Sequence, residues 1–123
     1  MRNSKSKTAC EKRRLKKCDE LFRAYSRLQS VYGDMLETDD SVASFRANVL
    51  LTDFEPGDSY TTDFVITKDD GTQAVRECVP RKRLTKPLQV KLLDASFRSW
   101  RDHGITDFGI VIDKDEEEEQ GGA

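Results

Sequence analysis

The segment TTDFVITKDDGTQAVRECVP, residues 61–80, constrains the fold more than any other part of the sequence. Two runs rich in Val, Ile, Thr and Phe flank KDDGT, a pattern typical of a β-hairpin. A three-residue loop puts Gly71 at the position that favours a left-handed backbone. The numbers of opposed residues then sum to 140, and Asp63 lies across from Glu77. A two-residue turn would give a sum of 141 and place Asp63 opposite Cys78 instead.

In the three-residue register the two acids share one face of the hairpin with three valines, and apolar residues also line the other face. Strands with two apolar faces are expected in the middle of a sheet. Like charges held ~5 Å apart destabilise a sheet, so Asp63 and Glu77 imply a divalent cation, a nearby Lys or Arg, or a raised pKa. Their oxygens suit Mg²⁺, which activates water in nucleases. The alternative is that one or both acids reach the sheet edge and stay solvated.

The N-terminal half predicts one long helix followed by strands. Apolar residues recur at spacings of three and four, which predicts an amphipathic helix over about 11–36, kinked or ended at Gly33. VASFRANVLL, residues 42–51, predicts a strand because it is rich in Val, Leu and Phe. The two hairpin strands are expected at about 60–68 and 72–79.

The C-terminal half predicts a second helix and a last strand. The helix spans about 87–103, with Thr85 as its N-cap and Pro87 in its first turn. Its apolar stripe comprises Leu88, Leu92, Leu93, Phe97 and Trp100. The run DFGIVID, residues 107–113, predicts a strand buried on both faces.

These elements together predict an α/β fold, a small mixed β-sheet flanked by two helices in the order helix, strand, strand, strand, helix, strand. The helix before the last strand predicts a right-handed crossover with parallel pairing. We expect a disordered basic N-terminus (1–10), a single domain (11–113) and a disordered acidic tail (114–123). The sequence has no signal peptide and no run of ~18 apolar residues, and its three cysteines lack CxxC spacing. A cytoplasmic protein with free thiols and no membrane association is therefore expected.

The charges are unevenly distributed along the chain. Residues 1–17 contain eight Lys or Arg residues and one Glu, whereas residues 113–123 contain six acids and one Lys. A basic body fits a nucleic-acid partner, although solvated ends that keep the protein soluble would give the same pattern. The tail is either a solubilising segment or a DNA mimic that inhibits the body. The candidate phosphate contacts, for which a solvated charged surface is the alternative, are Arg13, Arg14, Lys16 and Lys17, and Arg81, Lys82, Arg83 and Lys86 ahead of a helix N-terminus.

The order and spacing of these pieces resemble the PD-(D/E)XK nucleases, and within them the N-terminal domain of TnsA, the endonuclease subunit of heteromeric transposases. The resemblance covers about residues 26–113 and is carried by LQSVYGDMLETDDSVASF, YTTDF, ECVP and RLTKPLQVKLLDASFRSWRDHGITDFGIVID. It implies a restriction-endonuclease-like core (α-β-β-β-α-β), DNA as the partner, and Mg²⁺ held by Asp63 and Glu77. Other transposition or phage proteins are further expected partners.

Two of the four catalytic positions depart from the family pattern. The acid of the first helix falls at Gln29, which brings no charge, and the water-orienting lysine falls at Val79. Lys82 on a flexible loop would be a poor substitute. We therefore expect a TnsA-like DNA-binding protein of a mobile element or phage with impaired or lost cleavage. The alternatives are an active Mg-dependent endonuclease with a rearranged site and a small non-catalytic inhibitor or adaptor.

Overall fold

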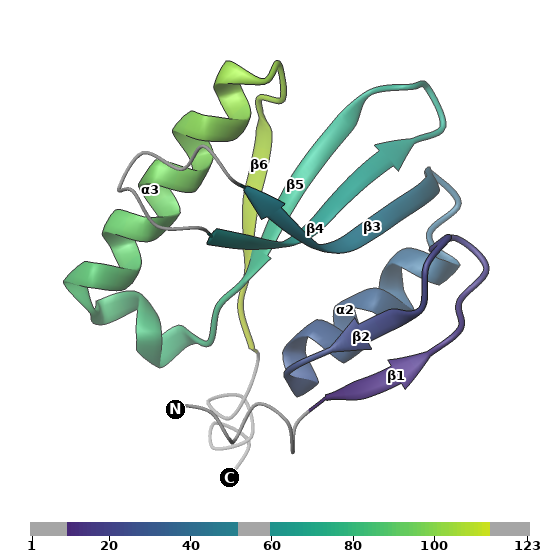
Figure 1. Ribbon diagram of the computed structural model, residues 1–123, viewed down its shortest axis with the longest axis horizontal. Coiled ribbons are helices and arrows are strands. Elements are labelled where there is room, and N and C mark those ends of the chain that lie inside the picture. The colour runs from purple at the N-terminus through teal and green to yellow at the C-terminus, as the bar shows by residue number, and fades with distance from the viewer. Residues whose placement is uncertain (1–9, 52–59, 114–123) are drawn as a thin grey trace, which may run out of the picture.

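Four strands form a mixed sheet at the centre of the computed structural model, which describes residues 10–51 and 60–113 (Figure 1). Their order across the sheet is β3 (Val42–Leu51), β4 (Tyr60–Lys68), β5 (Gln73–Cys78) and β6 (Asp107–Val111). β3 pairs antiparallel with β4, β4 pairs antiparallel with β5, and β6 runs parallel to β5. The predicted small mixed sheet is confirmed, as is the central place of the two hairpin strands.

Two helices cover opposite faces of this sheet. Helix α2 (Arg27–Thr38) begins at Ser26, whose hydroxyl accepts a hydrogen bond from the backbone N–H of Gln29 at 3.0 Å. Helix α3 (Pro87–Asp102) joins β5 to β6, as expected for a crossover between parallel strands. A short 3₁₀-helix, η1 (Arg81–Thr85), lies between β5 and α3.

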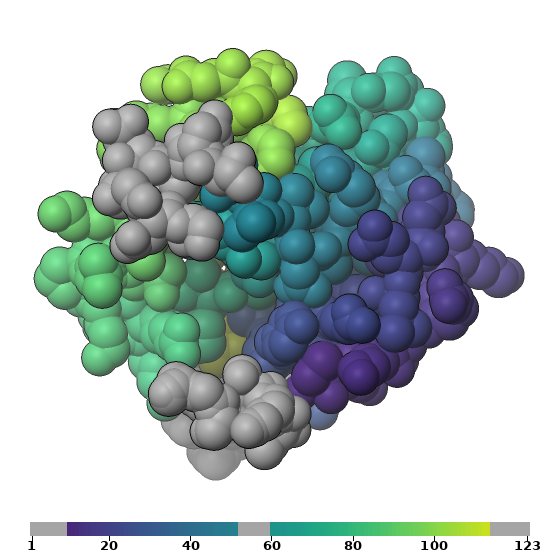
Figure 2. Space-filling view, viewed as in Figure 1, coloured from purple at the N-terminus to yellow at the C-terminus, as the bar shows by residue number. Residues whose placement is uncertain are grey.

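The prediction of a helix from residue 11 is wrong, because residues 11–24 contain two short strands. β1 (Glu11–Arg13) pairs antiparallel with β2 (Phe22–Ala24), and the pair lies on the outside of the molecule beside α2 and β3 (Figure 2). Phe22 is fully buried while its neighbour Leu21 is 37% exposed. Burial therefore alternates along β2 with a period of two, although the apolar spacing of the whole segment also fits a helix.

Gly33 neither kinks nor ends α2, which continues to Thr38. Gly33 is buried, and a Cβ atom built on it would lie 2.5 Å from Cζ of Phe22. The missing side chain thus lets the Phe22 ring pack directly against the helix backbone.

The two faces of the sheet bury different cores. On the α2 face the rings of Phe22, Phe45 and Phe64 are in mutual contact, with centroids 5.7–6.1 Å apart. On the α3 face Val65 and Val75 pack with Trp100 and four other apolar side chains, namely Leu51, Ala95, Ile105 and the partly buried Phe108. The alternation of the hairpin residues between the two faces agrees with the prediction.

Three details of the C-terminal half differ from the prediction. Lys86, not Thr85, precedes α3, and the Thr85 hydroxyl donates to the carbonyl of Lys82 within η1; Pro87 does open the helix. Leu88 is 67% exposed and lies outside the buried stripe. β6 is the outermost strand of the described sheet and is partly exposed on both faces, although its Phe108 packs against Phe97 of α3.

The predicted basic N-terminus and acidic tail lie outside the described residues, except for Cys10. Among the residues that the structure describes, no helix has the length and apolar character needed to cross a membrane.

Candidate functional site

The hairpin loop sets the position of the two acids. Gly71 has a φ of +89°, and the N–H of Lys68 donates to the carbonyl of Thr72 at 2.8 Å across the loop. Val65 pairs with Val75, so the residue numbers of opposed partners sum to 140 and the predicted three-residue register is confirmed. The ladder of β4 and β5 ends one step short of the two acids, at the pair of Phe64 and Arg76.

Asp63 and Glu77 are the next pair in this register, and their carboxylates take the place of the missing ladder bonds. The N–H of Asp63 donates to Oε1 of Glu77 at 3.0 Å, and the N–H of Cys78 donates to Oδ2 of Asp63 at 2.7 Å. Backbone N–H groups thus occupy the oxygens for which a cation was expected. The two acids are brought together as predicted, and each stabilises the strand that carries the other.

Glu77 is 1% exposed and lies in a polar network on the α3 face. The hydroxyl of Ser96 on α3 donates to its Oε2 at 2.9 Å. Thr62, also fully buried, interacts with the same carboxylate and accepts a hydrogen bond from the indole N–H of Trp100 at 2.8 Å. Tyr60 approaches the carboxylate from β4. This network connects two strands and a helix through one acid.

Burial changes the acidity of the whole group. It raises the pKa of Glu77 to about 7, only partly offset by the hydrogen bonds from Asp63, Ser96 and Thr62. It raises the pKa of Asp63 to about 6, partly offset by the Cys78 N–H. Burial, with the two nearby carboxylates, also raises the pKa of the Tyr60 phenol and of the Cys78 thiol. Asp63 and Glu77 are therefore partly protonated near neutral pH.

Ser96, Thr62 and Trp100 were not predicted as site residues. Ser96 stands between the buried Leu93 and Trp100 on α3, at spacings of three and four. A small polar residue within a buried helical stripe needs a hydrogen-bonding partner, and this was the available signal.

Gln29, which the predicted resemblance would place at the first acidic position, is buried on α2 and has its own partners. Its Oε1 accepts from the N–H of Tyr25 at 2.8 Å, and its Nε2 donates to Oδ1 of Asn48 at 2.9 Å. Asn48 has a φ of +56° and in turn donates to the carbonyl of Arg23 at 2.8 Å. The register of β3 and β4 places Asn48 beside Asp63, so Gln29 is connected to this row of the sheet through Asn48.

Val79, which the predicted resemblance would place at the lysine position, is 5% exposed, and its N–H donates to the carbonyl of Val111 at 2.9 Å. It extends the pairing of β5 with β6 by one residue. An apolar side chain buried there has no group that could orient water or contact a phosphate.

The carboxylates fit a magnesium site poorly as they lie. Three of their four oxygens, one on Asp63 and two on Glu77, already accept hydrogen bonds. An ion bound by both would have to displace these bonds, and Mg²⁺ is strict about its octahedral geometry. Among the described residues, no group of three or more His, Cys, Asp or Glu side chains is arranged to hold a metal. Magnesium binding therefore stays a prediction that requires rearrangement.

The second basic stretch lies directly after β5 and is exposed. Its four cations form what we call the cationic segment: Arg81, Lys82 and Arg83 of η1, and Lys86 at the start of α3. Within the described residues α3 has no side-chain N-cap, so the segment lies next to N–H groups at a helix start. The backbone N–H of Arg81 donates to Oδ1 of Asp113 at 2.8 Å.

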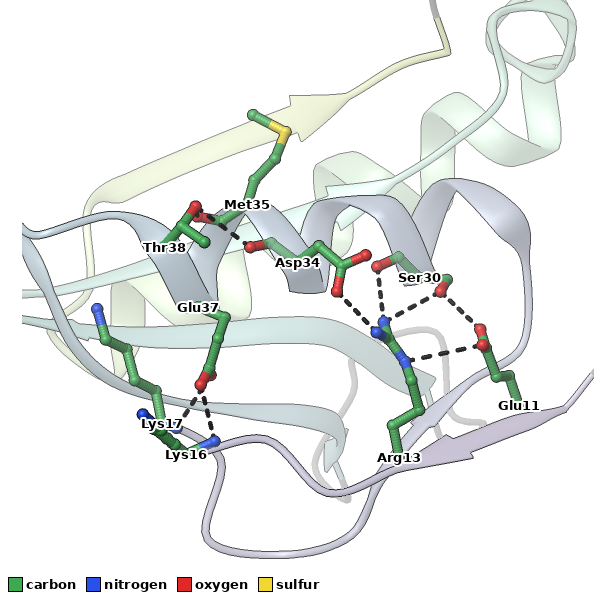
Figure 3. Close-up of polar contacts among 9 residues, drawn as sticks. All are labelled: Glu11, Arg13, Lys16, Lys17, Ser30, Asp34, Met35, Glu37 and Thr38. Atoms are coloured by element: carbon green, nitrogen blue, oxygen red, sulfur yellow. Dashed lines mark hydrogen bonds and ion pairs between the residues drawn. The ribbon is translucent and has the colours of Figure 1, made fainter.

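The first basic stretch serves mainly to attach β1 and the following loop to α2 (Figure 3). Arg13 forms an ion pair with Asp34 at 2.7 Å and donates to Ser30. The backbone N–H groups of Lys16 and Lys17 donate to the Glu37 carboxylate.

Two of the four predicted phosphate contacts in this stretch thus have a structural role. The Lys17 ammonium donates to the carbonyl of Asp39, and the Arg13 guanidinium lies 5.6 Å from the centre of the Phe22 ring. Arg14 and Lys16 are exposed, and the predicted helix that would have presented all four on one face is absent here.

The sequence matches no model of a known protein family, and comparison with curated proteins gives no significant match.

Proposed function

We propose that this chain is a cytoplasmic, TnsA-like nuclease-fold protein of a mobile element or phage that binds DNA without cleaving it. The observation that carries the proposal is the exposure of the cationic segment. The segment begins at Arg81, shortly after the end of β5 and four residues beyond Glu77. Exposed Lys and Arg side chains next to a helix start favour phosphate.

The bonding of the acid pair supports loss of cleavage. Asp63 and Glu77 hold together the ends of β4 and β5, and Glu77 is closed off from solvent. A hydrolytic site needs an accessible nucleophile held near its catalytic groups. The proposed resemblance thus concerns the framework and the positions of the two acids. In this chain the acids hold the strand ends together and do not serve in hydrolysis.

The partners at the remaining family positions support the same reading. Gln29 is engaged with Asn48, and Val79 is buried in the β5–β6 pairing. Neither residue can become an acid or a lysine without disturbing buried neighbours. Reactivation would therefore require changes in packing as well as in two side chains.

DNA binding is tested by the anisotropy of a labelled duplex over a range of KCl concentrations. Each phosphate contact contributes a slope of about 0.9 in the logarithm of the affinity against the logarithm of salt. We expect Lys82→Gln/Arg83→Gln to reduce the slope by about 2 and the low-salt affinity by roughly tenfold or more. The matched control is Arg98→Gln/Arg101→Gln, which removes the same charge from exposed positions farther along α3.

The outcomes separate the candidate functions. Equal losses for the two double variants would indicate attraction by overall charge rather than binding at the cationic segment. No binding at any salt concentration would favour the third reading, an inhibitor or adaptor that contacts protein.

Cleavage is tested by incubating supercoiled plasmid with the protein and Mg²⁺ or Mn²⁺, beside Asp63→Ala as a control. We expect no nicking by either protein. Nicking that requires both the metal and Asp63 would mean that the acids rearrange on DNA and that the chain is an active endonuclease.

A further inference from the structure

The last described residues after β6 and the start of the cationic segment leave the sheet side by side. Because β5 and β6 are parallel, their C-terminal ends lie at the same edge of the sheet, where Cys78 pairs with Val111 (Figure 1). Two residues beyond β6, the Asp113 carboxylate accepts the 2.8 Å hydrogen bond from the N–H of Arg81. The last described residue of the chain is thus bonded to the first residue of the cationic segment.

The residues that follow Asp113 have the charge and the reach to neutralise this segment. Residues 115–119 read Asp-Glu-Glu-Glu-Glu, five carboxylates against the four cations. An extended chain advances ~3.5 Å per residue, so position 119 can lie up to about 20 Å from Asp113. A 3₁₀-helix rises ~2 Å per residue, so Lys86 is only about 10 Å along the axis from Arg81.

We propose that residues 115–119 bind the cationic segment of their own chain and compete there with nucleic-acid phosphate. A tethered ligand acts at an effective concentration in the millimolar range, which makes a contact between five acids and four cations significant even when each pair is weak. The contact is screened by salt over a distance of about 8 Å at physiological ionic strength. The competition rests on the proposed function, whereas the intramolecular contact does not.

The intramolecular contact is tested without DNA by zero-length carbodiimide cross-linking and peptide mass spectrometry. In monomeric protein at low salt, we expect Lys82 and Lys86 to cross-link to residues 115–119, and the products to disappear at high salt. Cross-links from the exposed Lys12 to residues 115–119 serve as the internal control, and Lys68, which is paired with Asp107, should react with that residue instead. Equal cross-linking of Lys12, cross-links only between molecules, or none at all would overturn the contact.

Competition is tested with a variant in which residues 116–119 are all changed from Glu to Gln. We expect it to bind the labelled duplex roughly 5- to 10-fold more tightly than the parent protein at low salt, with the difference vanishing at high salt. A control variant neutralises four exposed acids elsewhere, Asp19→Asn, Glu20→Gln, Asp40→Asn and Asp102→Asn. An equal gain in this control would overturn the proposal, because net charge alone would explain both.

A double-mutant cycle shows whether the tail acts through the cationic segment. In the Lys82→Gln/Arg83→Gln background, the gain from neutralising the tail should fall to less than half. An undiminished gain would overturn binding at this segment. If no variant binds DNA, the competition fails together with the proposed function, while the cross-links still decide the intramolecular contact.

Discussion

The two faces of the four-stranded sheet bury different kinds of side chain. On the α2 face, three phenylalanine rings pack together and against Gly33, and the buried polar side chain of α2, Gln29, is an uncharged amide. On the α3 face, apolar side chains surround a fully buried carboxylate, that of Glu77, with the hydroxyl groups of Ser96, Thr62 and Tyr60 and an indole N–H around it. The same two strands, β4 and β5, supply residues to both faces.

The difference shows that the two faces are stabilised in different ways. The α2 face holds by close packing, for which any change of volume is unfavourable. The α3 face keeps a buried acid that a purely structural core would replace with an apolar residue, because an uncompensated carboxylate is expensive to bury. Glu77 is therefore the residue at which this face departs most clearly from a purely apolar core.

The largest effect is expected on the α2 face. Replacing Phe22 with Ala removes a fully buried ring that contacts Phe45 and Phe64, and should lower the free energy of unfolding by about 3–5 kcal/mol. The neighbouring substitution Leu21→Ala, at a side chain that is 37% exposed, should lower it by less than about 1 kcal/mol. Urea denaturation of both variants measures the two values. Similar losses would contradict the alternating burial of β2.

The second effect is a pH dependence that comes from the α3 face. The pKa of Glu77 rises from its ordinary value of 4.5 to about 7, so the folded protein holds this proton over a range in which the unfolded chain has lost it. The contribution of this protonation to the free energy of unfolding is on the order of 3 kcal/mol in total. It is fully present below pH 4.5 and is lost as the pH rises through 7. Asp63, with its pKa raised to about 6, adds a change of the same sign.

Glu77→Gln should remove the part of this dependence that Glu77 contributes and leave the part from Asp63, because an amide can accept from the Asp63 N–H and donate to Ser96 without titrating. The measurement is the free energy of unfolding of both proteins at intervals between pH 4.5 and 8. If the stability of the unmodified protein is constant or increases over this range, the Glu77 carboxylate is accessible to solvent.

The parts of the fold that sequence predicts well are those decided by neighbouring residues. The KDDGT loop fixes its register through one glycine, and the strand at residues 42–51 is found at the predicted positions. The N-terminal strands were missed because their apolar spacing fits a helix, whereas the packing of Phe22 against Gly33, which favours the strand, comes from another element. That contact joins two elements and leaves no local signal.

The candidate site shows the same division. Asp63 and Glu77 were placed opposite each other from the hairpin alone. Their hydrogen-bonding partners were not foreseen, because Ser96 comes from α3, and the bond between Trp100 and Thr62 connects residues 38 positions apart. Whether a carboxylate binds metal or closes a strand end depends on such distant groups, so its role could not be read from its position.

A third and smaller effect on stability is expected at Thr62, on the α3 face. Thr62→Val removes the acceptor of the Trp100 N–H and a group that lowers the pKa of Glu77. We expect a loss of about 1–2 kcal/mol at pH 7.5 and a smaller loss at pH 4.5, where Glu77 is protonated and needs less support. Thr61→Val, at the exposed neighbour on the same strand, is the control. Equal losses at both pH values would show that Thr62 stabilises the fold independently of the ionisation of Glu77.

The smallest effect reverses the sign of the pH dependence and so tests whether burial is its cause. Asp107 lies at the start of β6 with 44% of its side chain exposed, and it pairs with Lys68 at 3.0 Å and Arg76 at 2.9 Å. The Lys68 hydrogen bond, followed by Arg76, lowers its pKa, so its contribution is present above the ordinary value of 3.8 and is lost as the pH falls. Asp107→Asn should therefore lower the free energy of unfolding by less than about 1 kcal/mol at pH 7 and by almost nothing near pH 2.

Salt separates the two acids further. Exposed ion pairs are screened, so the effect of Asp107→Asn should shrink in high salt, whereas the effect of Glu77→Gln should persist because its cause is desolvation. Unfolding experiments in low and high KCl, at one pH above and one below each titration, provide the measurement. An acid on the edge strand and an acid inside the sheet would then respond to pH in opposite directions, as expected if solvent access rather than sequence separates the two roles. The same response from both acids would mean that Glu77 is solvated and that the contrast between the two faces of the sheet is weaker than its hydrogen bonds indicate.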